Sequence, residues 1–177
     1  MGGNYSFTRE DKNKYYYKIL FSTLVLHILG LIGYLYFKNI NNDRLVIYIS
    51  LGVLLGWFLV FALPVYVLYF NHKKFSKAVS FEVNGSVLKY NNKLRNEIIN
   101  FTFDDIEKVE LWLTPPAYDE RTDWLFFGKY HFTRIYTRKK QIINISCLVF
   151  EDTKEVFSEE LIIRKKKFFP IMKKNKI

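Results

Sequence analysis

Two long runs without a formal charge constrain this chain of 177 residues more than any other feature. Ile19 to Phe37 is an uncharged run of 19 residues, and Leu45 to Phe70 is a second one of 26 residues. As helices they would reach about 28 Å and about 39 Å, against a bilayer hydrocarbon core of about 30 Å. Apolar residues surround both predicted helices, which disfavours the alternative of a buried hairpin in a soluble core. We therefore expect an α+β membrane protein that begins with a transmembrane helical hairpin over residues 19–70.

Lysine and arginine counts beside the two runs predict the orientation of this hairpin. The seven-residue connector, 38–44, makes the helices antiparallel and carries only Lys38 and Arg44. The other side carries seven cations, which are Arg9, Lys12, Lys14, Lys18, Lys73, Lys74 and Lys77. Because cytoplasmic flanks of spans are enriched in Lys and Arg, we expect an integral cytoplasmic (inner) membrane protein with both termini in the cytoplasm. Residues 1–18 would then form a basic cytoplasmic N-terminus.

Small and polar residues inside the runs predict how the hairpin packs. Gly30 and Gly52 lie equally far from the connector, so we expect them at a similar depth, where small residues allow close backbone approach. Gly52 and Gly56 also form a small-xxx-small pair typical of helix dimers, although we favour packing within the hairpin. Pro64 is expected to kink the second helix by removing a backbone hydrogen bond. For His27 we expect a neutral, hydrogen-bonded ring near Gly56, and the alternative is a functional intramembrane group.

From about Ser76 the pattern changes to short alternating runs, which predict a compact β-rich domain over residues 76–163. The predicted strands cover residues 79–83, 86–90, 97–103, 109–113, 130–136 and 141–148. Asn84-Gly85 between the first two is a strong hairpin signal, because both residues tolerate positive φ. Asp104-Asp105 is expected to open one helical turn. A capping-box pattern at Asp152-Thr153-Lys154-Glu155 predicts one short amphipathic helix within residues 149–161.

Two stretches of the β-rich region carry a family resemblance. They are the Val79–Tyr90 hairpin and Phe103-Asp104-Asp105-Ile106-Glu107-Lys108-Val109, a hydrophobic-x-Asp-Ile-x-x-Val pattern. With two N-terminal spans and a short basic link, the chain resembles small bacterial membrane proteins that carry a pleckstrin-homology-like domain. The resemblance implies a small β-barrel or sandwich with one short helix. In the eukaryotic domains, phosphoinositides contact basic residues around the loop joining the first two strands. That loop here is Asn84-Gly85-Ser86 and has no cation, so phosphoinositide binding does not carry over.

Residue types that carry chemistry are few. One cysteine, Cys147, excludes an internal disulfide, and with three histidines it disfavours a structural zinc site. No phosphate-binding glycine loop, zinc-protease helix or nucleophile elbow occurs, so we expect no catalytic residue, no bound metal and no cofactor. Cys147 lies in an apolar strand and is expected to be a buried, inert thiol. The alternative is a metal-dependent enzyme or sensor that uses Asp119, Glu120, Asp123 and His131.

Aromatic side chains beside the charged loop at residues 115–123 are candidates for a surface that binds a protein partner. They are Trp124, Phe126 and Phe127. Trp112, by contrast, falls in the alternating core pattern of its own strand, so it is not one of these candidates. Burial in the core is nevertheless the interpretation that we favour for these three residues, because large aromatic side chains are mostly buried.

The last 14 residues, 164–177, form a tail with seven cations and no acid. An anionic leaflet attracts such clusters by about 1 kcal/mol per Lys or Arg, and the interleaved Phe168 and Phe169 would add insertion energy. We expect cations of the tail and of the hairpin end to contact lipid: Lys73, Lys74, Lys77, Arg164, Lys165, Lys166, Lys167, Lys173 and Lys174. The alternative is that Phe168-Phe169 packs onto the domain as a last strand.

The formal net charge of +10 lies mostly beside the predicted spans and in the tail, which indicates an anionic lipid surface rather than nucleic acid. We expect a non-enzymatic, membrane-anchored interaction or scaffold module, with its domain oriented by the inner leaflet and bound to a protein partner. Two alternatives stay open. One is an oligomeric channel, a transporter or a membrane-complex subunit, and the other is the metal-dependent enzyme or sensor at residues 119–131.

Cysteine labelling tests the predicted topology. A cysteine placed at Asn41, in the connector, should react with a membrane-impermeant maleimide from outside the cell. One placed at Asn92 should react only after the membrane has been opened, and the parent chain with Cys147 alone gives the background. The reverse pattern would refute the orientation.

Overall fold

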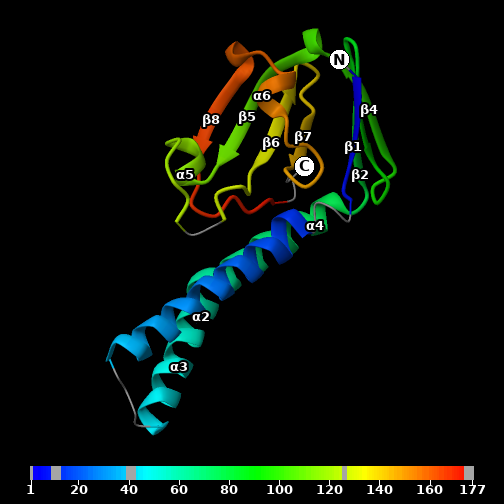
Figure 1. Cartoon of the computed structure of the whole chain (residues 1–177). Coiled ribbons are helices and arrows are strands. Elements are labelled where there is room, and N and C mark those ends of the chain that lie inside the picture. Colours follow the sequence, from blue (N-terminus) through cyan, green and yellow to red (C-terminus); the bar gives the residue numbers. More distant parts are fainter. Residues whose placement is uncertain (1, 9–12, 39–42, 125–126, 174–177) are drawn as a thin grey trace.

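A helical hairpin projects from a domain of two β-sheets (Figure 1). This computed structural model describes residues 2–8, 13–38, 43–124 and 127–173. The coarse class is therefore α+β with two long N-terminal helices, as the sequence predicts.

The hairpin helices are long and apolar enough to cross a membrane. The first is α2 (Lys18–Lys38), which follows the π-helical turn η1 (Asn13–Tyr17). The second runs through α3 (Asp43–Trp57), the π-helical turn η2 (Phe58–Ala62) and α4 (Leu63–Ser76). Pro64 follows η2 and lacks the N–H that would bond a carbonyl in that turn. The second helix is thus widened just before Pro64, and the kink that we expected there stays a prediction.

The two helices meet at a polar pair. Trp57 Nε1 donates to Thr23 Oγ1 at 3.1 Å, and the buried Thr23 hydroxyl donates to the Ile19 carbonyl at 2.9 Å. His27 Nδ1 donates to the Thr23 carbonyl at 2.7 Å, and its ring meets Phe61 with centroids 4.7 Å apart. The His27 ring is therefore hydrogen-bonded within the hairpin, and Phe61 of the second helix is its aromatic neighbour.

The glycines do not make the close approach that we expected within the hairpin. A Cβ built on Gly30, Gly52 or Gly56 would meet none of the described atoms within 4 Å. Gly30 instead lines a groove of about 490 Å³ between the helices, together with Leu26, His27, Leu31, Tyr34, Ile49 and Val53. The helices therefore do not close on one another at these glycines, and a use of the glycines in helix association outside the hairpin stays a prediction.

The described strands form two four-stranded sheets. Sheet A has the antiparallel order β1 (Gly2–Ser6), β2 (Val79–Asn84), β3 (Val87–Asn92) and β4 (Glu97–Thr102). Sheet B has the order β7 (Ile142–Ser146), β6 (Phe132–Thr137), β5 (Ile106–Leu113) and β8 (Ile162–Lys166), with β8 parallel to β5. Short helical turns connect them: η3 (Phe103–Asp105), α5 (Pro115–Tyr118), α6 (Thr153–Val156) and η4 (Glu159–Leu161).

Local signals place most of these elements correctly. The six predicted strands match β2 to β7, and Gly85 in the β2–β3 turn has the positive φ of 59° that its position requires. The predicted turn at Asp104-Asp105 is η3, where the Thr102 N–H donates to Asp105 Oδ2 at 2.9 Å and lowers the pKa of that carboxyl. The helix predicted within residues 149–161 is only α6, and Asp152 makes no side-chain cap.

Two strands extend the domain beyond its predicted limits of residues 76 and 163. β1 comes from the N-terminal segment and pairs with β2, so that Tyr5 stands opposite Phe81. β8 spans the expected boundary and contains the first cations of the predicted tail. The domain therefore begins before the hairpin and ends after it.

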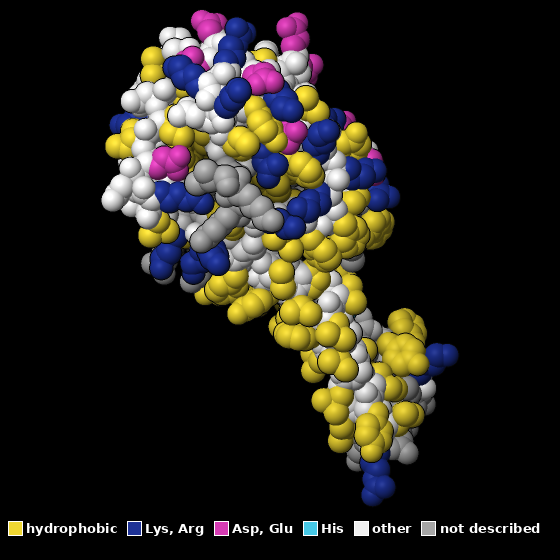
Figure 2. Space-filling model, turned by 180° about the vertical axis from the view of Figure 1, so that it is seen from behind, with side chains coloured by type: hydrophobic (Ala, Val, Ile, Leu, Met, Phe, Trp, Pro, Cys, Tyr) yellow, Lys and Arg dark blue, Asp and Glu magenta, His cyan; other side chains and the backbone are white. Residues whose placement is uncertain are grey.

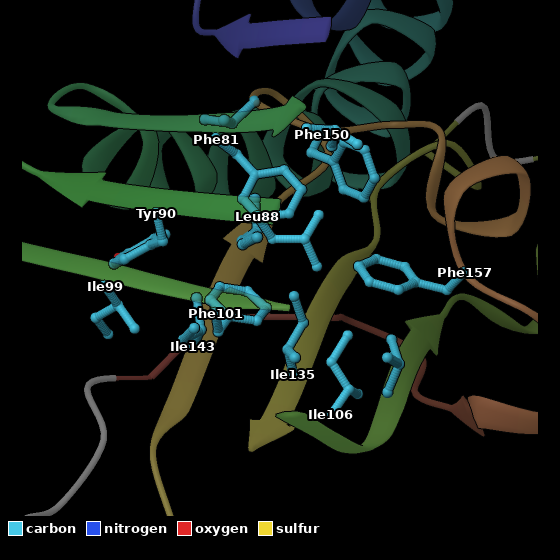
Figure 3. Packing of buried hydrophobic residues seen from close by; sticks show 14 of the residues in the cluster. Phe81, Leu88, Tyr90, Ile99, Phe101, Ile106, Ile135, Ile143, Phe150 and Phe157 are labelled. Carbon is cyan, nitrogen blue, oxygen red and sulfur yellow. The ribbon is translucent and has the colours of Figure 1, made fainter. Parts of the chain in front are cut away.

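The domain core lies between the two sheets. Figure 3 shows Phe81, Leu88 and Phe101 of sheet A directed toward Ile135 and Ile143 of sheet B, and all five are buried. Alternation along each strand places these side chains on the inner face and polar ones outside. Two aromatic side chains from the segment after β7, Phe150 and Phe157, complete the same cluster.

The Trp57–Thr23 hydrogen bond gives a stability prediction. Thr23→Val keeps the shape of the side chain but removes the acceptor of the Trp57 N–H. Side-chain hydrogen bonds between transmembrane helices contribute about 0.6 kcal/mol on average and up to about 1.7 kcal/mol. Unfolding of the detergent-solubilised chain should show a loss of that size. Ser22→Ala is the control, because Ser22 bonds only its own helix, at the Ile19 carbonyl; equal losses in both variants would contradict the assignment.

Candidate functional site: the junction between hairpin and domain

The inner end of the hairpin and the β domain share one buried cluster, which we call the junction core. Its hairpin members come from η1, α2 and α4. Its domain members lie just before β6 and just after β7. They are Tyr15, Ile19, Val65, Leu68, Tyr69, Phe127, Tyr130, Cys147 and Leu148. The helices thus end inside the hydrophobic packing of the domain and not in a free linker.

The last turns of α4 supply one face of this core. Val65, Leu68, Tyr69, His72 and Ser76 are buried, at the three- and four-residue spacing of one helix face. The opposite face of the same turns stays exposed. This amphipathic end explains why the second helix continues to Ser76, six residues beyond its uncharged run.

His72 is fully buried and bridges the helix to two segments of the domain. Its Nε2 lies 2.9 Å from the Pro170 carbonyl and its Nδ1 lies 2.9 Å from Ser146 Oγ. A carbonyl only accepts, so Nε2 carries the proton and Nδ1 accepts from the Ser146 hydroxyl. The Ser146 oxygen in turn accepts the Leu148 N–H at 3.1 Å. Both ring nitrogens are therefore satisfied by a neutral imidazole.

Three further contacts close the junction around His72. Asn71 Nδ2 donates to the Met172 carbonyl at 3.2 Å, and the Met172 N–H donates to Asn71 Oδ1 at 2.8 Å. The Tyr130 hydroxyl donates to the Tyr15 carbonyl, and burial raises the pKa of Tyr130 well above its usual value. Lys14 forms an ion pair with Glu151 at the rim. The N-terminal segment, α4 and the C-terminal segment are thus all tied to the domain here.

The predicted basic tail is largely part of the folded domain. Arg164 donates to the carbonyls of Ala117 and Tyr118 at 3.2 and 2.7 Å and pairs with Glu120 at 3.0 Å. Lys166 pairs with Asp119 at 2.7 Å. The alternative that the tail packs onto the domain therefore holds for residues 164–172, although the strand is β8 and not Phe168-Phe169.

Lys167 also belongs to the domain. Its Nζ donates to the Ile171 carbonyl at 3.1 Å and lies 5.6 and 5.9 Å from the ring centroids of Trp112 and Phe132. Burial, followed by the charge of Lys173, lowers the pKa of Lys167. Arg164, Lys166 and Lys167 therefore do not form the free lipid-contacting tail that we expected.

The other predicted lipid-contacting cations remain at the surface. Lys74, Lys77, Lys165 and Lys173 are exposed. Lys73 is half-buried, with its Nζ 5.6 and 5.4 Å from the ring centroids of Tyr69 and Phe70. Lys174 lies outside the described residues.

The predicted aromatic partner surface is divided. Phe127 is buried in the junction core and stacks on Phe169 with ring centroids 5.4 Å apart. Burial, the interpretation that we favoured, therefore holds for Phe127, and its candidacy for an exposed partner surface is wrong. Its apolar ring fills the space between the domain and the hairpin. Trp124 is 78% exposed, and Phe126 lies outside the described residues.

The acids and the histidine of residues 119–131 have separate partners. Asp119 pairs with Lys166, Glu120 with Arg164, and Asp123 Oδ2 accepts the Gly128 N–H at 2.5 Å. His131 Nδ1 donates to the Lys129 carbonyl at 3.0 Å. Within the described ranges, no group of three or more His, Cys, Asp or Glu side chains is close enough to hold a metal ion.

Cys147 is 3% exposed, and its Sγ lies 3.7 Å from His72 Nδ1. Burial raises the pKa of this thiol to about 12. A thiol that stays protonated at neutral pH is a poor nucleophile. Cys147 is thus the buried, unreactive residue that we expected, and as the single cysteine of the chain it can report whether the junction opens.

Sequence patterns alone miss the junction. We singled out His27, but the buried bridging histidine is His72, whose partners Ser146 and Pro170 lie 74 and 98 residues away. One signal was available, since the second uncharged run is longer than a bilayer requires.

Comparison with family models, with curated proteins and with solved structures gives no match for this chain. The function of the junction is therefore argued from its geometry.

The His72 bridge yields a prediction that Cys147 can measure. His72→Leu leaves the Ser146 hydroxyl and the Pro170 carbonyl buried without this partner. The loss costs about 2 kcal/mol, which raises the equilibrium constant for opening of the junction roughly 30-fold. Maleimide labelling of Cys147 in the detergent-solubilised chain should accelerate accordingly.

Two controls accompany this variant. His131→Leu removes a half-buried ring outside the junction core and should leave labelling unchanged. Ser146→Ala should reduce the stability of the junction less in the His72→Leu background than in the parent chain, because the His72–Ser146 hydrogen bond is already lost there. Labelling of the His72→Leu variant at the parent rate would contradict the role of the bridge.

Proposed function

We propose that this chain is a non-enzymatic, membrane-anchored interaction module. The hairpin anchors the protein in the cytoplasmic membrane, with both termini inside. The β domain, held at a fixed orientation on the inner end of the hairpin, binds a protein partner. The junction core carries this proposal, because a domain on a flexible tether would have no use for helix ends buried in its packing.

The proposed topology has support from sheet A. β1 precedes the hairpin and β2 follows it, yet the two strands pair over five residues. The two inner ends of the hairpin are thus on the same side, next to the domain. The excess of Lys and Arg on that side supports the cytoplasm as its location.

We assign the domain to the pleckstrin-homology-like kind. Support comes from the β2–β3 hairpin, the short turn η3 that leads into β5, and two sheets packed around one core. The same domain contains the parallel pairing of β8 with β5 and the helix α6 of four residues.

Anionic lipid is the proposed orienting surface. Lys74 and Lys77 are exposed at the end of α4, and Lys173 is exposed where the C-terminal segment leaves the junction. A surface cation beside an anionic leaflet gains about 1 kcal/mol.

A second candidate function, that of a subunit in a membrane complex, is favoured by one observation. The groove between α2 and α3 is open, and Gly30, Gly52 and Gly56 have free space beside them. Small residues of this kind let another transmembrane helix approach closely.

Photo-cross-linking of the full chain in native membranes tests the proposal. A photoreactive residue at Ile98 on β4 or at Ile163 on β8, which are 62% and 40% exposed, should give a discrete adduct with a second protein. A photoreactive residue at the buried Ile135 is the matched control and should give none. Adducts from the hairpin alone, at Gly52, would favour the complex-subunit candidate. Steady turnover of a substrate by the purified chain would contradict a non-enzymatic role.

A further inference from the structure

Two large aromatic side chains stay exposed on the face of the domain that adjoins the hairpin. Trp124 is 78% exposed and Phe168 is 55% exposed. Trp124 lies three residues before Phe127, and Phe168 directly precedes Phe169, which packs against the junction core. Figure 1 shows the loop after α5 and the segment after β8 running along the end of the domain that faces the hairpin. The two exposed rings therefore lie at the rim of the junction.

The depth of this rim follows from α4. Over residues 65–70, Val65 and Leu68 are buried against the domain, whereas Tyr66 and Phe70 remain 49% and 41% exposed. These six residues rise by about 9 Å. The second uncharged run, at about 39 Å, exceeds a hydrocarbon core of about 30 Å by the same amount. When the hairpin spans a bilayer, the rim is thus level with the headgroups.

Exposed cations next in the chain to junction-core residues suit an anionic headgroup layer. Lys129, in the loop of Trp124, and Lys18, at the start of α2, are exposed cations. The acid next to Trp124 turns inward, because Asp123 Oδ2 accepts the Gly128 N–H. A Cβ on Gly128 would lie only 2.7 Å from that oxygen. Glycine at this position therefore allows the Asp123–Gly128 hydrogen bond, which directs the carboxylate away from the rim.

We propose that Trp124 and Phe168 are interfacial membrane anchors, whose rings enter the headgroup region of an anionic leaflet and set the tilt of the domain. Aromatic side chains are enriched at this level of a bilayer, and cations beside them attract anionic headgroups. Hydrophobic side chains continue from the hairpin onto the adjoining part of the domain (Figure 2), so that one lipid surface meets both. The inference rests on the membrane anchoring proposed above and adds a contact made by the domain itself.

Tryptophan fluorescence of the full chain in vesicles tests this contact. Trp57→Phe with Trp112→Phe leaves Trp124 as the single tryptophan, and Trp112→Phe with Trp124→Phe leaves Trp57. The vesicles contain phosphatidylcholine and phosphatidylglycerol with bromine either near the headgroup or near the end of the acyl chain. Trp124 should lose most fluorescence to the bromine near the headgroup, and Trp57, near the middle of its run, to the bromine at the chain end. Phe168→Trp in a tryptophan-free chain should behave like Trp124.

Val87→Trp in the tryptophan-free chain is the matched control. Val87 is 45% exposed and is the first residue of β3. The six residues of β2 separate its turn from the end of α4. This variant should be quenched by aqueous iodide and not by brominated lipid. Slow labelling of Cys147 confirms that each variant is folded.

Four results would overturn the assignment. Quenching of Trp124 by iodide to the extent of the Val87→Trp variant means that water, not lipid, meets the ring. Protection of Trp124 from both iodide and brominated lipid means that protein covers it. If brominated lipid quenches Trp57 but not Trp124, only this inference fails; if it quenches neither, the membrane anchoring itself fails as well.

Discussion

The shared packing of helix ends and domain is the constraint on which the rest of this structure depends. Val65, Leu68 and Tyr69 serve at once as the end of an apolar helix and as core residues of the domain. A neutral His72 then joins this helix to β7 and to the C-terminal segment through bonds that leave both ring nitrogens satisfied. Because an unpaired buried polar group is costly, the three segments hold one another in a single arrangement. The direction of the hairpin thereby determines which face of the domain would meet a membrane that the hairpin spans.

The positive charge of the C-terminal segment has a different use from the one its composition indicates. Arg164 and Lys166 hold α5 against β8, and Lys167 lies beside two aromatic rings. Long cationic side chains pack through their aliphatic stems while their heads find carbonyls or carboxylates. Under the membrane anchoring that we propose, lipid would instead be met by the cations at the end of α4 and by the exposed aromatic side chains of the rim. Net charge was thus a poor guide to which cations are free at the surface, because Arg164, Lys166 and Lys167 have partners within the domain.

Most of the domain could be predicted from local patterns, and the junction could not. Alternation and Asn84-Gly85 placed β2 to β7, because inner and outer faces are encoded in neighbouring residues. β1 was missed, since its five residues carry no alternating apolar pattern and pair with a strand far along the chain. His72 was missed for the same reason, because its partners come from distant segments. The glycines misled us within the hairpin, where Trp57 and Thr23 form the hydrogen bond between the two helices. A motif of small residues marks a place where another helix can come close, but it does not say which helix.

β1 also dictates the order in which the protein can be made. Tyr5 leaves the ribosome first, but Phe81, opposite it in the sheet, follows only 76 residues later, after both helices. At about 5–20 residues per second, the N-terminal segment waits roughly 4–15 seconds for its partner strand. Sheet A can therefore be completed only once the hairpin has been synthesised, and the completed sheet holds the two ends of the hairpin on one side. The strand that precedes the hairpin thus stays unpaired until both helices and β2 have followed it.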